Sequence, residues 1–204
     1  MYLILINMKI LYVHGYNGNP YGESYNNLKN ACGDLHELYT IDYDANNPKE
    51  AILNIFKYVK NNNIECVIGA SLGGFLTMHL SGVLRIVVNP CWDPATELPI
   101  VGYNDNIECY KTLLNDLLEY TDIEESELCA GVFANNDELL GNKYLPVFKK
   151  YFKRAYNING GHRISVEMAN EIINNILPNH DNAATEFCEK LKMIDNAPWI
   201  DNYE

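Results

Sequence analysis

A serine flanked by glycines is the first feature of this sequence that could do chemistry. The stretch 68–75 reads IGASLGGF and places Ser71 in a Gly69-x-Ser71-x-Gly73 pattern. The apolar run before it is typical of a short buried strand, and the residues after it are typical of a helix. A serine on such a turn is typical of a nucleophile elbow, whose strained backbone requires small residues two positions away on either side. The alternative is a glycine-rich turn with a serine helix cap that cradles a phosphate.

A serine hydroxyl becomes a good nucleophile only when a base takes its proton and a third group orients that base. Asp137 follows the apolar run CAGVFA at 129–134, and His162 closes the glycine-rich loop NGGH. Their order after Ser71, acid and then histidine, is the order expected for this kind of elbow. We therefore predict Ser71 as nucleophile, Asp137 as acid and His162 as base. Considered separately, Asp137 is also typical of a helix cap, and His162 of a loop residue.

Other titratable residues compete for these roles. Asp93 follows the strand after the elbow and is an alternative acid, whereas Glu138 is expected to face away. His79 lies too far down the elbow helix to meet Ser71, so a packed or surface role is expected. His36 and His180 have no chemical partners nearby in the sequence. No HExxH motif, paired CxxC or phosphate-binding loop is present, so we expect neither a metal nor a cofactor.

Backbone donors for a developing oxyanion are expected at two turns. The first predicted strand ends in VHGYNGNP at 13–20, and in a fold with a nucleophile elbow this turn supplies the N–H of Tyr16. The second donor is the N–H of Leu72, at the start of the elbow helix. The alternative is a plain strand-ending turn, because NGNP is itself turn chemistry. The connection 91–107, with Trp92 and Tyr103, is expected to wall a modest, fairly open substrate pocket.

Strands and helices alternate along the chain and would bring these residues together. Because the strands are apolar on both faces, they predict a doubly wound α/β fold, with a mostly parallel sheet of about six strands covered by helices on both faces. The predicted strands are 9–14, 38–43, 65–70, 84–89, 128–134 and 154–158. The predicted helices are 21–31, 49–61, 72–82, 108–120, 139–152 and 164–176.

Length and composition predict one domain over residues 1–204. The chain has 204 residues and 48% apolar content, enough for one sizeable core. Residues 1–7 could be an N-terminal extension, and 179–204 are expected to add a helix at 183–194 and a tail. The N-terminus has neither the basic region nor the cleavage site of a signal peptide. No apolar run approaches the ~18 residues of a membrane helix, so no membrane partner is expected.

Charge and cysteine content further limit the classes of binding partner and the cellular location to be expected. A formal net charge of −12 disfavours nucleic acid, anionic lipid and anionic substrates such as coenzyme A thioesters. The six cysteines are scattered without a CxxC pair, and several lie in apolar strand patterns. This distribution favours a reducing, cytoplasmic location.

Five motifs, in this order and at these intervals, resemble those of the small capless α/β-hydrolase esterases of the YqiA-like type. The motifs are HGYNGNP, IGASLGGF, VVNPCWDP, NNDELL and NGGH, and the resemblance spans residues 9–178. It implies a minimal α/β-hydrolase fold, carboxylesterase activity on a small ester or thioester, and the roles given above for Ser71, Asp137, His162, Tyr16 and Leu72. The helix after residue 178 and the pair Cys91-Trp92 depart from the pattern and leave the substrate preference open.

The sequence thus predicts a cofactor-independent serine hydrolase that acts on a small-molecule acyl ester through an acyl-enzyme. Two alternatives stay open. A hydrolase-fold protein with an idle triad would be a binding or scaffold module, and an acyltransferase or lyase would use the same scaffold. A hydrolase and a transferase share the acyl-enzyme and differ only in the acceptor that reaches it. The oligomeric state is also open.

Overall fold

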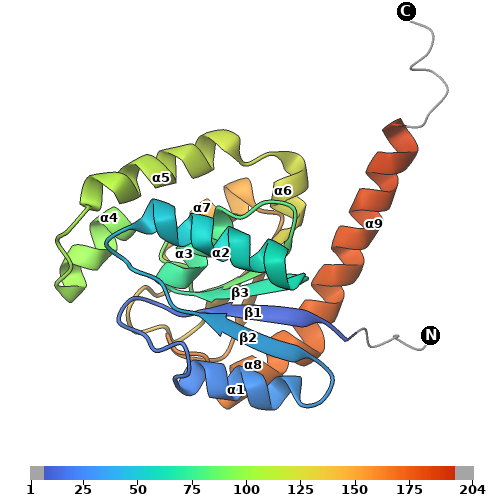
Figure 1. The fold of residues 1–204 in the computed structure, drawn as a ribbon, viewed down its shortest axis with the longest axis horizontal. Coiled ribbons are helices and arrows are strands. Elements are labelled where there is room, and N and C mark those ends of the chain that lie inside the picture. The colour runs from blue at the N-terminus through green and yellow to red at the C-terminus, as the bar shows by residue number, and fades with distance from the viewer. Residues whose placement is uncertain (1–6, 196–204) are drawn as a thin grey trace, which may run out of the picture.

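Six parallel strands form a single sheet at the centre of the computed structural model, which describes residues 7–195 (Figure 1). The strand order is β2-β1-β3-β4-β5-β6, and every neighbouring pair is parallel. The strands are β1 (Lys9–Val13), β2 (Glu37–Ile41), β3 (Cys66–Ala70), β4 (Leu84–Val88), β5 (Cys129–Ala134) and β6 (Arg154–Ile158). The predicted doubly wound α/β fold is confirmed.

The sheet reverses its strand order at β1, which pairs with β2 on one side and β3 on the other. In an open α/β sheet, ligands bind beyond the carboxyl ends of the strands at such a point. Val13, the last residue of β1, is in register with Gly69 near the end of β3. The turn after β1 and the turn that carries Ser71 are therefore neighbours.

Helices cover both faces of the sheet because the strands bury apolar side chains on both. One core packs α2 (Pro48–Asn62), α3 (Leu72–Met78), α5 (Ile107–Tyr120) and α7 (Leu145–Tyr151) against residues such as Leu11 and Val67. The other core packs α1 (Glu23–Cys32), α8 (Val166–Glu171), η2 (Ile172–Ile176) and α9 (Leu177–Asp195) against residues such as Ile10 and Ile68. The alternation of adjacent strand residues between the two cores follows from the pleat.

Two predicted helices are shorter in the structure than in the sequence analysis. The elbow helix α3 ends at Met78 rather than at residue 82, because tight turns from Leu76 and Thr77 close it before Gly82. Helix α7 begins at Leu145 rather than at residue 139. Gly141 adopts a left-handed conformation that interrupts a helix, and a proline at 146 fits the first turn of a new one.

The C-terminal helical region, by contrast, is longer than predicted. We predicted separate helices at 164–176 and 183–194, but the backbone is helical without interruption from Val166 to Asp195. The turn η2 is π-helical, so the N–H of Leu177 donates to the carbonyl of Ile172, five residues back. A proline ring collides with the carbonyl four residues earlier in a regular α-helix. The wider turn just before Pro178 relieves this collision.

The connection between β4 and α5 is also structured. It holds α4 (Pro94–Glu97) and the 3₁₀ turn η1 (Leu98–Val101), and a further short helix, α6 (Ile123–Glu127), precedes β5. Within residues 7–195, no helix has the length and apolar character needed to cross a membrane. Most of the proposed extension 1–7 and the tail beyond residue 195 lie outside the described residues.

Candidate active site

Ser71 occupies a strained turn between β3 and α3. Its φ is +53° and its ψ is −118°, a conformation that residues other than glycine rarely adopt. Three backbone hydrogen bonds hold it: the N–H of Ser71 donates to Val88, and its carbonyl accepts from Phe75 and Cys91, at 3.0, 3.1 and 3.0 Å. Strain maintained by the surrounding structure is a common feature of catalytic serines on such turns.

The two glycines of the motif are required by close packing. A β-carbon at Gly73 would lie 2.3 Å from the carbonyl oxygens of both Val13 and His14, and one at Gly69 would lie 2.3 Å from Thr77 Oγ1. A larger residue at Gly73 would push the elbow away from the end of β1, and one at Gly69 would push α3 away from β3. The spacing of the motif thus reflects the contact between the turn and its neighbours.

Asp137 and His162 lie together beyond the ends of β5 and β6. His162 Nδ1 is 3.0 Å from Asp137 Oδ1, which also accepts hydrogen bonds from the N–H groups of Leu139 and Leu140. The Asp137 side chain is fully buried. Burial raises its pKa, but the hydrogen bonds from His162, Leu140 and Leu139 outweigh burial and lower the pKa below its usual value. The ionised carboxylate accepts a hydrogen bond from the N–H at Nδ1, which leaves Nε2 as the basic nitrogen.

Two residues hold the loop that carries His162, and neither role was predicted from the sequence. Asn89, just after β4, donates from Nδ2 to the carbonyls of Gly161 and His162 at 3.0 and 3.1 Å, and its Oδ1 accepts from the N–H of Ala134. Glu138 accepts the N–H of His162 at 3.0 Å instead of facing away as we expected. The position of the Asn-Pro pair at a strand end was the only sequence signal for Asn89.

Ser71 and His162 line one cavity of about 590 Å³. The turn after β1 forms one side of this cavity, and α4, η1 and the loop before α7 form another. The polar lining includes Asn17, Asn19, Glu23, Ser24, Glu97, Lys143 and Arg163. The apolar lining includes Leu98, Ile100, Val101, Leu139 and Leu140.

The turn after β1 lies against the nucleophile. A β-carbon at Gly15 would be 3.0 Å from Ser71 Cβ, so a larger residue there would force the turn and the elbow slightly apart. The N–H of Gly18 donates to Gly15, which leaves the N–H of Tyr16 outside the hydrogen bond of the turn. Leu72 is the first residue of α3, where helix geometry leaves the N–H without an intrahelical partner. Both predicted oxyanion donors are therefore on turns next to Ser71.

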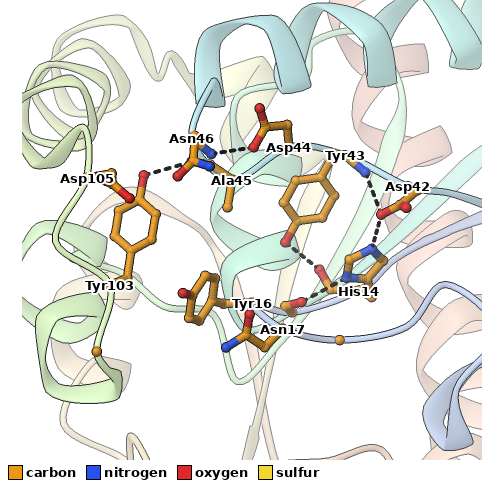
Figure 2. Close-up of a pocket in the computed structure, with 13 residues that line it drawn as sticks. His14, Tyr16, Asn17, Asp42, Tyr43, Asp44, Ala45, Asn46, Tyr103 and Asp105 are labelled. Atoms are coloured by element: carbon orange, nitrogen blue, oxygen red, sulfur yellow. Dashed lines mark hydrogen bonds and ion pairs between the residues drawn. The ribbon is translucent and has the colours of Figure 1, made fainter.

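His14 holds this turn in place through both of its ring nitrogens. Its Nδ1 lies 2.8 Å from the carbonyl of Gly15 and its Nε2 lies 3.1 Å from Asp42 Oδ1. Figure 2 shows the imidazole beside the ring of Tyr43, on which it stacks at 4.7 Å, while the Tyr43 hydroxyl donates to the carbonyl of His14. These contacts give His14 a structural role beside the turn.

The same turn also lines a second cavity of about 390 Å³, together with the segment 42–46 after β2 (Figure 2). Tyr103 lines this cavity, and its hydroxyl donates to the carbonyl of Ala45. Trp92 does not line either cavity described here; it is buried in the core against Phe148 and Phe152. Neither residue that we expected to wall the catalytic pocket therefore does so, because α4 and η1 carry that wall.

The competing candidates have other partners. Asp93 caps α4 by accepting hydrogen bonds from the N–H and hydroxyl of Thr96. His79 lies between the carbonyls of Phe75 and Leu113, and His180 is buried beside the carbonyl of Arg85. His36 accepts from the N–H of Met8. Within the described residues, no cluster of three or more His, Cys, Asp or Glu side chains could hold a metal ion.

Comparisons with known proteins agree with this architecture. A family model described as Uncharacterised protein family (UPF0227) matches residues 9–158. No curated protein matches. The structure of Est1E from Butyrivibrio proteoclasticus is similar over 87% of this chain and 89% of its own, with 13% identity and a TM-score of 0.64.

Two further structures are similar. The esterase domain of a Rhodothermus marinus protein covers 84% of both chains, with 13% identity and a TM-score of 0.63. Alpha/beta hydrolase domain-containing protein 10 from mouse covers 85% of this chain and 90% of its own, with 15% identity and a TM-score of 0.60. At these identities the similarity establishes the fold, which is that of the α/β hydrolases.

Proposed function

We propose that this chain, which belongs to the Uncharacterised protein family (UPF0227), is a carboxylesterase-type serine hydrolase that cleaves a small carboxylic ester or thioester. One observation carries the proposal: the strained Ser71 shares a cavity with His162, whose Nδ1 is hydrogen-bonded to the buried, ionised Asp137. The fold shared with esterases supports it. The cavity is large enough for a small-molecule substrate.

The proposed reaction uses these groups in two steps, acylation of Ser71 and hydrolysis of the acyl-enzyme. Ser71 Oγ attacks the acyl carbonyl while His162 Nε2 accepts its proton, and Asp137 stabilises the imidazolium through Nδ1. The N–H groups of Tyr16 and Leu72 stabilise the oxyanion. Collapse of the tetrahedral intermediate breaks the ester bond, and the departing alkoxide takes the proton from His162. Water then attacks the acyl-enzyme by the same route and releases the acid.

Two further proposals concern the whole chain. We infer a single domain, because both apolar cores flank one sheet and α9 packs in the second of them. We also infer a cytoplasmic location. All six cysteines are free thiols, and four of them are buried, which suits a reducing compartment.

The nucleophile is tested by a fluorophosphonate probe, followed by mass mapping of the modified residue. We expect the label on Ser71, and Ser71→Ala should abolish labelling and lower the turnover of p-nitrophenyl acetate by about 10⁴-fold or more. Ser81→Ala, which changes an exposed serine outside the cavity, is the matched control and should label as the native protein does. A label that persists in folded Ser71→Ala would show that another residue attacks the ester.

A further inference from the structure

An ion pair lies in the wall of the catalytic cavity and has no part in the proposed reaction. Glu97, at the end of α4, and Lys143, in the loop before α7, both line the cavity that holds Ser71. Lys143 Nζ is 2.6 Å from Glu97 Oε1. The Glu97 side chain is only 9% exposed, whereas that of Lys143 is 48% exposed. A charged carboxylate is therefore held almost completely away from bulk solvent, at the edge of a substrate-sized space.

Both members of this pair have further hydrogen-bonding groups that a ligand could use. Glu97 Oε1 accepts from both Lys143 and the hydroxyl of Tyr144. Among the described residues, none donates a hydrogen bond to the other oxygen, Oε2. The ammonium of Lys143 has three N–H donors and uses one of them on Glu97. A ligand in the cavity thus finds a free acceptor and free donors side by side.

The residues next to this ion pair on the wall of the cavity are apolar. Leu98, Ile100 and Val101 lie on the same wall, and Leu139 and Leu140 lie in the same loop as Lys143. Because Lys143 is half exposed, solvent screens this ion pair, and its contribution to stability is small. A polar pair in an apolar substrate wall is the arrangement by which binding sites fix orientation.

We propose that Glu97 and Lys143 form a subsite for a hydroxyl group on the acyl chain of the substrate. The inference rests on the proposed serine hydrolase function. A charged ligand would be attracted by one member of the pair and repelled by the other. A hydroxyl group suits both, because it can donate to Glu97 Oε2 and accept from Lys143 Nζ. The strongly negative chain also disfavours an anionic ligand.

The geometry assigns the remainder of the acyl chain to the apolar wall. The residues between Cys91, which hydrogen-bonds Ser71, and the end of η1 carry both Glu97 and the apolar side chains. An acyl group bound to Ser71 therefore passes along an apolar surface that contains one hydrogen-bonding position. The substrate class is an ester of a hydroxylated aliphatic acid, with methylene groups between the carbonyl and the hydroxyl.

The test compares esters that differ only in this hydroxyl. Values of kcat/KM are measured for p-nitrophenyl 6-hydroxyhexanoate and p-nitrophenyl heptanoate, in which a methyl group replaces the hydroxyl, and for the longer pair 8-hydroxyoctanoate and nonanoate. We expect the native protein to prefer the hydroxyl ester of at least one pair, and Glu97→Gln and Lys143→Met each to reduce that preference by about tenfold. The ratio of two substrates on one sample does not depend on the folded fraction.

An exposed ion pair provides the matched control. Glu108 and Lys111 form an exposed pair on α5, at 2.5 Å, and neither lines the cavity. Glu108→Gln and Lys111→Met should leave the substrate ratio unchanged. A monoester of adipic acid serves as the anionic competitor, and a native preference for it over the hydroxyl ester would overturn the choice of hydroxyl.

The subsite and the catalytic proposal fail in different ways. If Ser71-dependent hydrolysis is found but the Glu97 and Lys143 variants keep the native ratio, the subsite is wrong and the hydrolase proposal stands. If no ester is hydrolysed, the hydrolase proposal is wrong. The subsite is then decided by calorimetric binding of 6-hydroxyhexanamide against heptanamide. A preference for the hydroxyl amide that both variants reduce supports the subsite, and equal binding of the two amides by the native protein overturns it.

Discussion

At the scale of single residues, one carboxylate oxygen organises the candidate acid and base. Asp137 Oδ1 accepts from the backbone at Leu139 and Leu140 and lies against His162 Nδ1. Burial raises the pKa of this carboxyl, but the hydrogen bonds from His162, Leu140 and Leu139 together lower it below its usual value. The two backbone bonds orient Oδ1, and the ionised Oδ1 in turn favours the imidazole tautomer with its proton on Nδ1.

Asp137→Asn tests this role, with Asp93→Asn as the matched control. An asparagine keeps the shape of the side chain, but its amide can donate to Nδ1 and so favours the tautomer with the proton on Nε2. We expect kcat for p-nitrophenyl acetate to fall by about 10³- to 10⁴-fold. Asp93→Asn should change kcat by less than about twofold, since asparagine also caps a helix well. The reverse order of effects would place the acid after β4.

At the scale of elements, the site depends on three loops that meet at the carboxyl edge of the sheet. Asn89 follows β4, its Oδ1 binds the last residue of β5, and its Nδ2 binds the loop after β6. Its φ is +44°, a conformation that asparagine tolerates better than most residues. The histidine loop is thus tied to two neighbouring strands by one buried amide.

Asn89→Asp separates positioning from simple stability. The carboxylate can still accept from Ala134, but it cannot donate to Gly161 and His162, whose carbonyls it would repel. We expect kcat and the rate of fluorophosphonate labelling to fall by about 10- to 100-fold, with KM changed much less. Asn135→Asp is the control, because Asn135 is exposed and bonds only to Asn159 among the described side chains. Loss of stability with native kcat in the folded fraction would make Asn89 a structural residue only.

At the scale of the whole molecule, helix α9 is fixed to the sheet by a buried histidine. His180 is fully buried, and its Nε2 lies 3.1 Å from the carbonyl of Arg85 in β4 and 3.2 Å from that of Leu128. Burial lowers the pKa of His180 to about 4; the carbonyls oppose this shift, and the charges of Arg154 and Arg85 favour it. The neutral imidazole is therefore part of the folded state.

This lowered pKa predicts an acid-sensitive stability. The folded protein binds the proton only near pH 4, whereas an unfolded histidine binds it near 6.5. Stability is therefore complete above about pH 6.5 and is lost as the pH falls toward 4. The contribution lost by pH 5 is about 2 kcal/mol. Urea unfolding at pH 7.5 and pH 5 should show a smaller decrease for His180→Gln than for the native protein, and equal decreases would contradict the prediction.

Local patterns in the sequence determined the elements and the order of the reactive groups. Strands with apolar residues on both faces require helices on both sides, so β3, β4 and the six-stranded sheet could be predicted closely. The spacing of Gly69, Ser71 and Gly73 reflects steric limits within a few residues of the turn. Asp137 and His162 were found because each follows a recognisable strand.

Only the tertiary structure decided which side chains surround these groups. Asn89 and Gly161 are 72 residues apart, and their hydrogen bond exists because β4 and the histidine loop reach the same edge of the sheet. Glu97 and Lys143 meet across 46 residues, and the path of α4 turns Trp92 into the core instead of the cavity. Helical periodicity and strand alternation describe residues near in sequence. Contacts between loops depend on which strands are neighbours and how each loop leaves the sheet, and no local pattern encodes either.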